Sequence, residues 1–180
     1  MLIIGLAGPQ FSGKTLVASH LCERHNAWVF DSTWIREEVI RRGMPLERAS
    51  YNAVTKELHA LRGDGFIARE MLWQLPSPKP RLAVHDGLRL IADVPEHRQA
   101  TDFRLIYLES SLECRFARAR GVVKNGRRAI NTMEEFMADE QLESEREIPL
   151  FKSQADLVLA SERRDWLLNA VDRQLAVWLK

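Results

Sequence analysis

The sequence predicts an α/β protein in which about five parallel strands form a sheet with helices on both faces. Three observations support this fold class. Short apolar runs alternate with segments of helical spacing along the chain. The first apolar run contains no charged residue, as expected for a strand that is buried on both faces. The 180 residues, 46% of them hydrophobic and 28% charged, suffice for one domain over residues 1–180.

Five apolar runs predict the strands, because buried parallel strands are short and continuously hydrophobic. These runs are residues 2–7, 27–30, 81–86, 103–108 and 156–160. The third run ends in Asp86, which places a carboxylate at the carboxyl end of a strand. Three prolines at 76–80 remove backbone donors, so we expect a connector before that run.

Segments with helical spacing fill the intervals between these runs. They are residues 13–25, 33–42, 46–61, 66–75, 89–99 (a short helix or an irregular turn), 111–120, 132–147 and 164–179. Thr33 is a candidate N-cap. Thr132 and Glu135 have the spacing of a capping box. Pro149 is expected to close the helix that starts at 132.

The segment from Gly8 to Thr15 lies between the first strand and the first helix, and it reads GPQFSGKT. It matches G-x-x-x-x-G-K-S/T, the phosphate-binding loop or P-loop. In such a loop backbone N–H groups and the helix N-terminus hold phosphate oxygens. We expect Lys14 to reach the β- and γ-phosphates and to be catalytic. The predicted nucleotide-binding residues are Gly8, Pro9, Gln10, Phe11, Ser12, Gly13, Lys14, Thr15 and Leu16.

Thr15 and Asp86 are the predicted Mg²⁺ ligands, and Asp86 is also a predicted catalytic residue. P-loop enzymes need a hydroxyl from the loop and a carboxylate from a neighbouring strand to hold the cation of MgATP. Because ligands bind at the carboxyl ends of parallel strands, Asp86 should face Thr15. The alternative is an ordinary turn aspartate before Gly87.

Thr33 and Arg36 follow the second strand and are candidate acceptor-binding residues. A cation at the start of a helix opposes the helix dipole, so Arg36 is suited to an anion such as an acceptor phosphate. The alternative is a solvated helix face.

A basic run follows the fourth strand and predicts a lid at roughly 115–147. It comprises Arg115, Arg118, Arg120, Lys124, Arg127 and Arg128. We expect at least one of these arginines to neutralise charge on the transferred phosphoryl group, with Arg115 and Arg118 as the first catalytic candidates. The alternative is a soluble surface balanced by the acidic helix that follows.

Composition argues against several other classes of function. The net charge of +1 is unlike that of a general nucleic-acid or membrane-surface binder. Cys22 and Cys114 lie far apart, no Cys/His cluster has metal-ligand spacing, and the five histidines carry no assignment. We see no signal peptide and no run that could span a bilayer, so a cytoplasmic location is expected.

Short elements outside the P-loop resemble nucleoside and nucleotide kinases. Asp86-Gly87-Leu88-Arg89 is similar to the D-G-F/Y-P-R element of adenylate kinases, and residues 34–38 resemble their acceptor segment. The chain also resembles dephospho-CoA-kinase-like and deoxynucleoside monophosphate kinase proteins. The resemblance implies that Arg89 and Arg36 contact acceptor phosphate. Phe11 stands where adenylate kinases carry glycine, and Thr33 stands where their acceptor-site aspartate falls.

These observations predict an ATP- and Mg²⁺-dependent phosphotransferase that acts on a small phosphorylated acceptor. A nucleoside monophosphate or a dephospho-CoA-like nucleotide is the expected acceptor. The alternative is an ATP-binding regulatory or partner protein whose acceptor site is degenerate. A switch GTPase is disfavoured, because the sequence lacks D-x-x-G after a strand and N-K-x-D.

Overall fold

The computed structural model of the chain describes residues 1–31, 33–122, 130–141 and 145–180. Within this part of the chain, five strands form one sheet in the order β2-β3-β1-β4-β5, and all neighbours are parallel. The strands are β1 (Leu2–Ala7), β2 (Trp28–Phe30), β3 (Leu82–Asp86), β4 (Asp102–Glu109) and β5 (Leu157–Ala160). The predicted parallel sheet is therefore confirmed, with each strand within one residue of its expected bounds.

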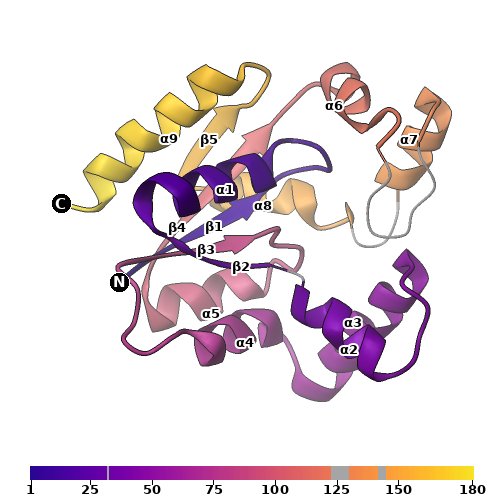
Figure 1. The fold of residues 1–180 in the computed structure, drawn as a ribbon, viewed down its shortest axis with the longest axis horizontal. Helices are drawn as coiled ribbons and strands as arrows, with labels where there is room; N and C mark the ends of the chain where they lie inside the picture. Colours follow the sequence, from indigo (N-terminus) through magenta and orange to yellow (C-terminus); the bar gives the residue numbers. More distant parts are fainter. Residues whose placement is uncertain (32, 123–129, 142–144) are drawn as a thin grey trace.

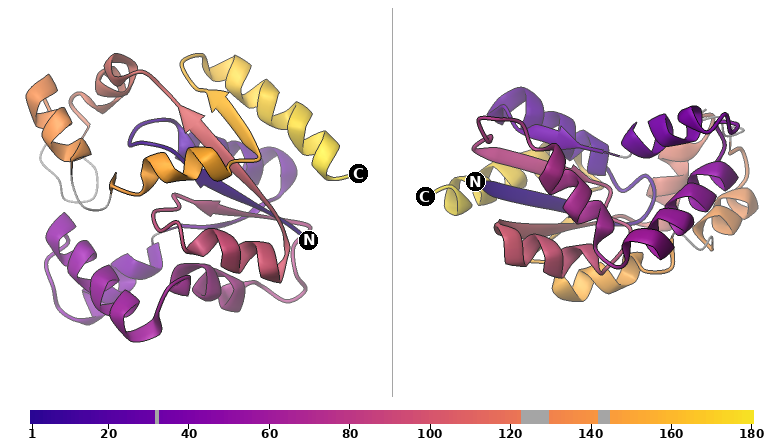
Figure 2. Two further views of the ribbon diagram at one scale, coloured as in Figure 1. Left: turned by 180° about the vertical axis from the view of Figure 1, so that it is seen from behind. Right: turned by 90° about the horizontal axis from the view of Figure 1, so that it is seen from below.

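Helices cover both faces of the sheet (Figure 1). One face carries α1 (Lys14–His25) and α9 (Arg164–Trp178), and the other carries α4 (Phe66–Gln74), α5 (Asp93–Ala100) and α8 (Ile148–Gln154). Two helix pairs flank the edge where the strands end: α2 (Thr33–Arg41) with α3 (Arg48–Arg62), and α6 (Leu112–Ala119) with α7 (Met133–Glu140). Figure 2 shows both pairs projecting beyond this edge of the sheet.

The central strand β1 divides its buried side chains between two hydrophobic clusters, because successive residues of a strand point to opposite faces. Leu2, Ile4 and Leu6 pack in the cluster under α1 and α9. Ile3 and Ala7 pack in the cluster on the other face. Full burial of this strand fixes the position of the loop that follows it.

Local capping signals explain where several helices begin. The capping box of α7 is confirmed, since the Thr132 side chain accepts from the Glu135 N–H and the Glu135 side chain accepts from the Thr132 N–H. The expectation that Thr33 caps α2 is wrong. Thr33 is the first helical residue, and its N–H donates to Oδ1 of Asp31 at 2.8 Å.

The expected end of the helix that starts at 132 is also wrong. The helix α7 ends at Glu140, and a separate helix, α8, begins at Ile148. Pro149 lies in the first turn of α8, where its missing N–H costs no intrahelical hydrogen bond. Each helix in the described part of the chain is too short or too polar to cross a bilayer.

Candidate active site

The loop between β1 and α1 contains three residues with positive φ, a backbone conformation that favours glycine and is strained for other residues. Gly8 has φ +139° and Gly13 has φ +96°. A Cβ on Gly8 would lie 2.4 Å from the carbonyl oxygen of Leu108, so a side chain at this position would clash with β4. Phe11 is a non-glycine residue at φ +57°, which is sterically uncommon. Gly13 is the N-cap of α1, so the loop leads directly into the helix N-terminus.

Gln10, Ser12 and Lys14 are buried polar residues of this loop. The Lys14 ammonium donates to the carbonyl oxygens of Gly8 and Pro9, both at 2.7 Å. These contacts hold the ammonium against the loop. The hydroxyl of Ser12 is buried and has no hydrogen-bond partner within the described residues. A buried hydroxyl without a partner is costly, and an anionic ligand in the loop would satisfy it.

Thr15 and Asp86 meet across the ends of β1 and β3. The Thr15 hydroxyl donates to Oδ2 of Asp86 at 3.0 Å, although the two residues are 71 positions apart. Beside them lies a cavity of about 270 Å³, whose lining also includes Glu23 and Asp31. Hydroxyl and carboxylate oxygens are the ligands that Mg²⁺ prefers. The residues present at this position therefore fit a magnesium ion.

A buried histidine pair supports the strand that delivers Asp86. His85 Nδ1 and His97 Nε2 are 2.9 Å apart, and the His97 ring stacks on Phe103. Burial lowers the pKa of His85 well below its usual value, with a further contribution from His97. Burial also lowers the pKa of His97 to about 4. Both rings are therefore neutral at pH 7 and add no positive charge that would oppose a cation beside Asp86.

Arg115 and Arg118 of α6 both contact the backbone of the P-loop. Arg118 Nη1 donates to the carbonyl oxygen of Phe11 at 3.0 Å, and its other amino group donates to the carbonyl oxygen of Ser161. Arg115 is buried, forms an ion pair with Glu140 and donates to the Ser110 carbonyl at 3.2 Å. The structure thus brings both predicted arginines to the loop, but it pairs Arg115 with a carboxylate.

An aromatic contact joins Phe136 of α7 to Phe11 of the P-loop. The ring of Phe136 is fully buried, and its centroid lies 6.1 Å from that of Phe11 and 5.9 Å from that of Phe116. The guanidinium of Arg115 lies 5.5 Å from the same ring. Gln10 Nε2 donates to the Asp139 carbonyl at 3.3 Å. The side chain of Phe11 therefore serves as a docking point for α7.

The structure shows no hydrogen bond that links the predicted acceptor residues Thr33, Arg36 and Arg89 to one another within the described residues. Arg36 and Thr33 are exposed on α2, and within the described residues Arg36 makes no hydrogen bond or ion pair. Arg89 Nη1 donates to Oε2 of the buried Glu145 at 2.6 Å. Arg89 thus connects the turn after β3 to the segment before α8.

Three basic residues of the expected lid, Lys124, Arg127 and Arg128, lie outside the described residues. Sequence reasoning missed Glu140 and Glu145 as arginine partners, because both belong to an acidic run that resembles a solvated surface. It also missed Phe136, for which the only signal was an apolar residue within a charged helix. Both cysteines are free.

Several solved structures with a similar fold are kinases. The fold is similar to shikimate kinase from Bacteroides thetaiotaomicron, with a TM-score of 0.58 and 18% identity over 99% of this chain and 98% of that one. A gluconokinase from Sinorhizobium meliloti 1021 has a TM-score of 0.52 and 15% identity over 98% and 90% of the two chains. These likenesses show the fold, and they confirm the expected α/β P-loop fold.

Sequence relatives are found among archaeal proteins, whereas no protein-family model matches the chain. A UPF0200 protein of Methanosarcina acetivorans is 33% identical over 129 residues, which are 71% of this chain and 67% of the relative. A UPF0200 protein of Methanosarcina mazei is 32% identical over 129 residues, with the same coverage. The chain belongs to the UPF0200 family.

Proposed function

We propose that the protein is an ATP- and Mg²⁺-dependent phosphotransferase that acts on a small phosphorylated acceptor, a nucleoside monophosphate or a dephospho-CoA-like nucleotide. The observation that carries the proposal is the 3.0 Å contact between the Thr15 hydroxyl and the Asp86 carboxylate. It supports the proposal because it joins a P-loop to a second strand end with oxygen ligands suited to the cation of MgATP. A P-loop by itself would serve many nucleotide-binding proteins.

In this proposal, residues Gly8 to Leu16 and the N-terminus of α1 bind the triphosphate, mainly through backbone N–H groups, which Pro9 lacks. Lys14 holds the β- and γ-phosphates from its position over the loop. Thr15 and Asp86 would hold Mg²⁺, which when bound neutralises charge on the same phosphates. With a nucleoside monophosphate as acceptor, an oxygen of its phosphate bonds to the γ-phosphorus as the bond to the bridging oxygen of ADP breaks, and ADP leaves. Positioning and charge stabilisation supply most of the rate enhancement.

Arg115 and Arg118 stabilise the transferred phosphoryl group from the lid at 115–147. Their contacts with the carbonyl oxygens of Gln10 and Phe11 support this role, because they hold both guanidinium groups beside the loop. Docking of α7 on Phe11 also supports a lid that excludes water, which would otherwise accept the phosphate.

Arg36, Arg89 and Thr33 bind the acceptor in this proposal. Arg36 is exposed and makes no hydrogen bond within the described residues, so its charge is available to an anion. Arg89 is engaged by Glu145 through one of its amino groups, and a guanidinium offers five N–H donors. An acceptor phosphate would therefore share Arg89 with Glu145 or displace that carboxylate.

The Arg89–Glu145 ion pair also favours a second candidate function. If Glu145 holds Arg89 permanently, the acceptor site is degenerate, and the protein binds ATP as a regulatory or partner protein. The two candidates differ in whether an acceptor accelerates the release of ADP.

The test measures ADP release by the purified protein with ATP and Mg²⁺ alone, and then with each member of an acceptor panel. The panel contains nucleoside monophosphates, deoxynucleoside monophosphates and dephospho-CoA. A phosphotransferase releases ADP at least about tenfold faster with one acceptor, and the phosphorylated acceptor appears in equal amount. Equal rates across the panel would favour the regulatory protein.

Variants of two lysines test the site itself. Lys14→Ala should abolish ATP binding or turnover, because it removes the ammonium over the loop. Lys79→Ala is the matched control, since Lys79 is exposed in the connector before β3, at the opposite edge of the sheet. Unchanged ATP binding and turnover in Lys14→Ala would refute the site assignment.

A further inference from the structure

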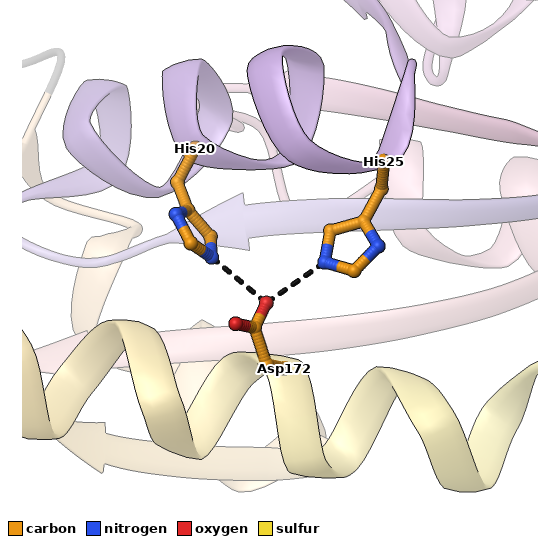
Figure 3. A group of neighbouring side chains, drawn as sticks. All are labelled: His20, His25 and Asp172. Carbon is orange, nitrogen blue, oxygen red and sulfur yellow. Dashed lines mark hydrogen bonds and ion pairs between the residues drawn. The ribbon is translucent and has the colours of Figure 1, made fainter.

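Two histidines of α1 and one aspartate of α9 converge on a single point (Figure 3). The Nε2 atoms of His20 and His25 each lie 2.8 Å from the same oxygen, Oδ1 of Asp172. The histidines are 152 and 147 positions from Asp172 in the sequence. Their three ligand atoms all lie within 4.8 Å of one another, and all three side chains are partly buried.

This set of atoms has the chemistry of a transition-metal site. Imidazole nitrogen and carboxylate oxygen are ligands that Zn²⁺ prefers, with bonds of about 2.0–2.2 Å. Tetrahedral coordination at those lengths separates neighbouring ligand atoms by about 3.4 Å. The observed 2.8 Å contacts need to lengthen by about half an ångström, which small side-chain rotations provide. Water would complete the coordination, because the site is only partly buried.

Charge at the site favours a cation. Asp172 supplies a carboxylate, which is the acidic ligand among the three. Arg24 Nε lies 3.3 Å from the other carboxylate oxygen, Oδ2, and leaves Oδ1 to the histidines. The guanidinium is largely exposed, so solvent screens its repulsion of a metal ion.

We propose that His20, His25 and Asp172 form a Zn²⁺ site that cross-links the P-loop helix α1 to the C-terminal helix α9. The site is distinct from the oxygen-lined position beside Thr15. Thr15 lies in the first turn of α1, and His20 and His25 follow it by 5 and 10 residues, which is about 7.5 and 15 Å along the helix. The two positions also differ in chemistry, since nitrogen ligands select against Mg²⁺. Zinc would hold the far end of the P-loop helix against α9.

The first test titrates Zn²⁺ into chelator-treated, metal-free protein by calorimetry. One equivalent should bind, and a tenfold molar excess of Mg²⁺ over the protein should leave this affinity unchanged. His25→Gln and Asp172→Asn should each lower the zinc affinity at least about tenfold. The matched control is His59→Gln, because His59 makes a 2.7 Å contact with Asp64 but belongs to no such three-residue group in the described part of the chain. That variant should retain the affinity of the unmodified protein.

The second test measures thermal unfolding, which does not depend on catalysis. Zinc at about one hundred times its dissociation constant should raise Tm by about 5–10 °C. This rise should disappear in Asp172→Asn. A circular dichroism spectrum equal to that of the unmodified protein would confirm that the variant is folded. Displacement of zinc by Mg²⁺, equal zinc affinity in all variants, or the absence of saturable binding would each overturn the proposal.

Discussion

Replacement of Asp93 by asparagine should change how the stability of this protein depends on pH. Asp93 lies at the start of α5 with no exposed surface, and its Oδ1 accepts the N–H of Ala68, in the first turn of α4, at 3.0 Å. Its Oδ2 is buried without a hydrogen-bond partner within the described residues. Burial raises the pKa of Asp93 from 3.8 to about 7, although backbone N–H groups of Ala68 and Ile67 lower it in part.

The sign of the effect follows from the protons bound in each state. Between about pH 4 and about pH 7 the folded protein keeps the Asp93 proton, whereas the unfolded chain has released it. Stability contributed by the neutral carboxyl is therefore complete below about pH 4 and is lost as the pH rises to about 7. A difference of about 3 pKa units corresponds to about 4 kcal/mol. An asparagine side chain cannot ionise, so Asp93→Asn should lack this loss.

Urea denaturation of both proteins between about pH 4 and about pH 8 measures the effect. As the pH rises, the free energy of unfolding of Asp93→Asn should increase relative to that of the unmodified protein. The measured quantity is the change with pH of the difference in free energy of unfolding between the two proteins. Any cost of burying the amide nitrogen is the same at every pH and does not affect this change. Asp102→Asn is the control, because Asp102 is exposed. Parallel pH profiles of Asp93→Asn and the unmodified protein would refute the reasoning.

Three further substitutions probe the site. Phe136→Ala should lower the free energy of unfolding, measured by urea denaturation, by about 3–5 kcal/mol, because it removes a fully buried ring. The control Met137→Ala should change it by less than about 0.5 kcal/mol, because Met137 is exposed. Asp86→Asn should raise the Mg²⁺ concentration for half-maximal ADP release at least about tenfold, and an unchanged Mg²⁺ dependence would contradict the metal assignment. Glu145→Gln should lower the acceptor KM about fivefold in steady-state kinetics by releasing Arg89, and an unchanged KM would remove Arg89 from the acceptor site.

The sheet and the P-loop could be predicted because their signals are local. The six residues of β1 are apolar, which indicates burial on both faces, and the eight residues that follow carry their own turn geometry. Asp86 could be placed opposite Thr15 for the same reason, since parallel strands end at one edge of a sheet. The boundary at Pro149 was misjudged, because proline is compatible both with the end of one helix and with the first turn of the next.

Partners of charged side chains could not be predicted in the same way. Arg89 and Glu145 are 56 positions apart, and Asp172 joins His20 and His25 across more than 140 positions. Neither grouping has a characteristic spacing, so the histidines carried no assignment from the sequence. Such contacts form only after helices have docked on the sheet, because docking, and not the order of residues, sets which side chains come within hydrogen-bond distance. Local backbone preference thus decides the elements and the loop, while packing of distant helices decides the ion pairs and the candidate metal site.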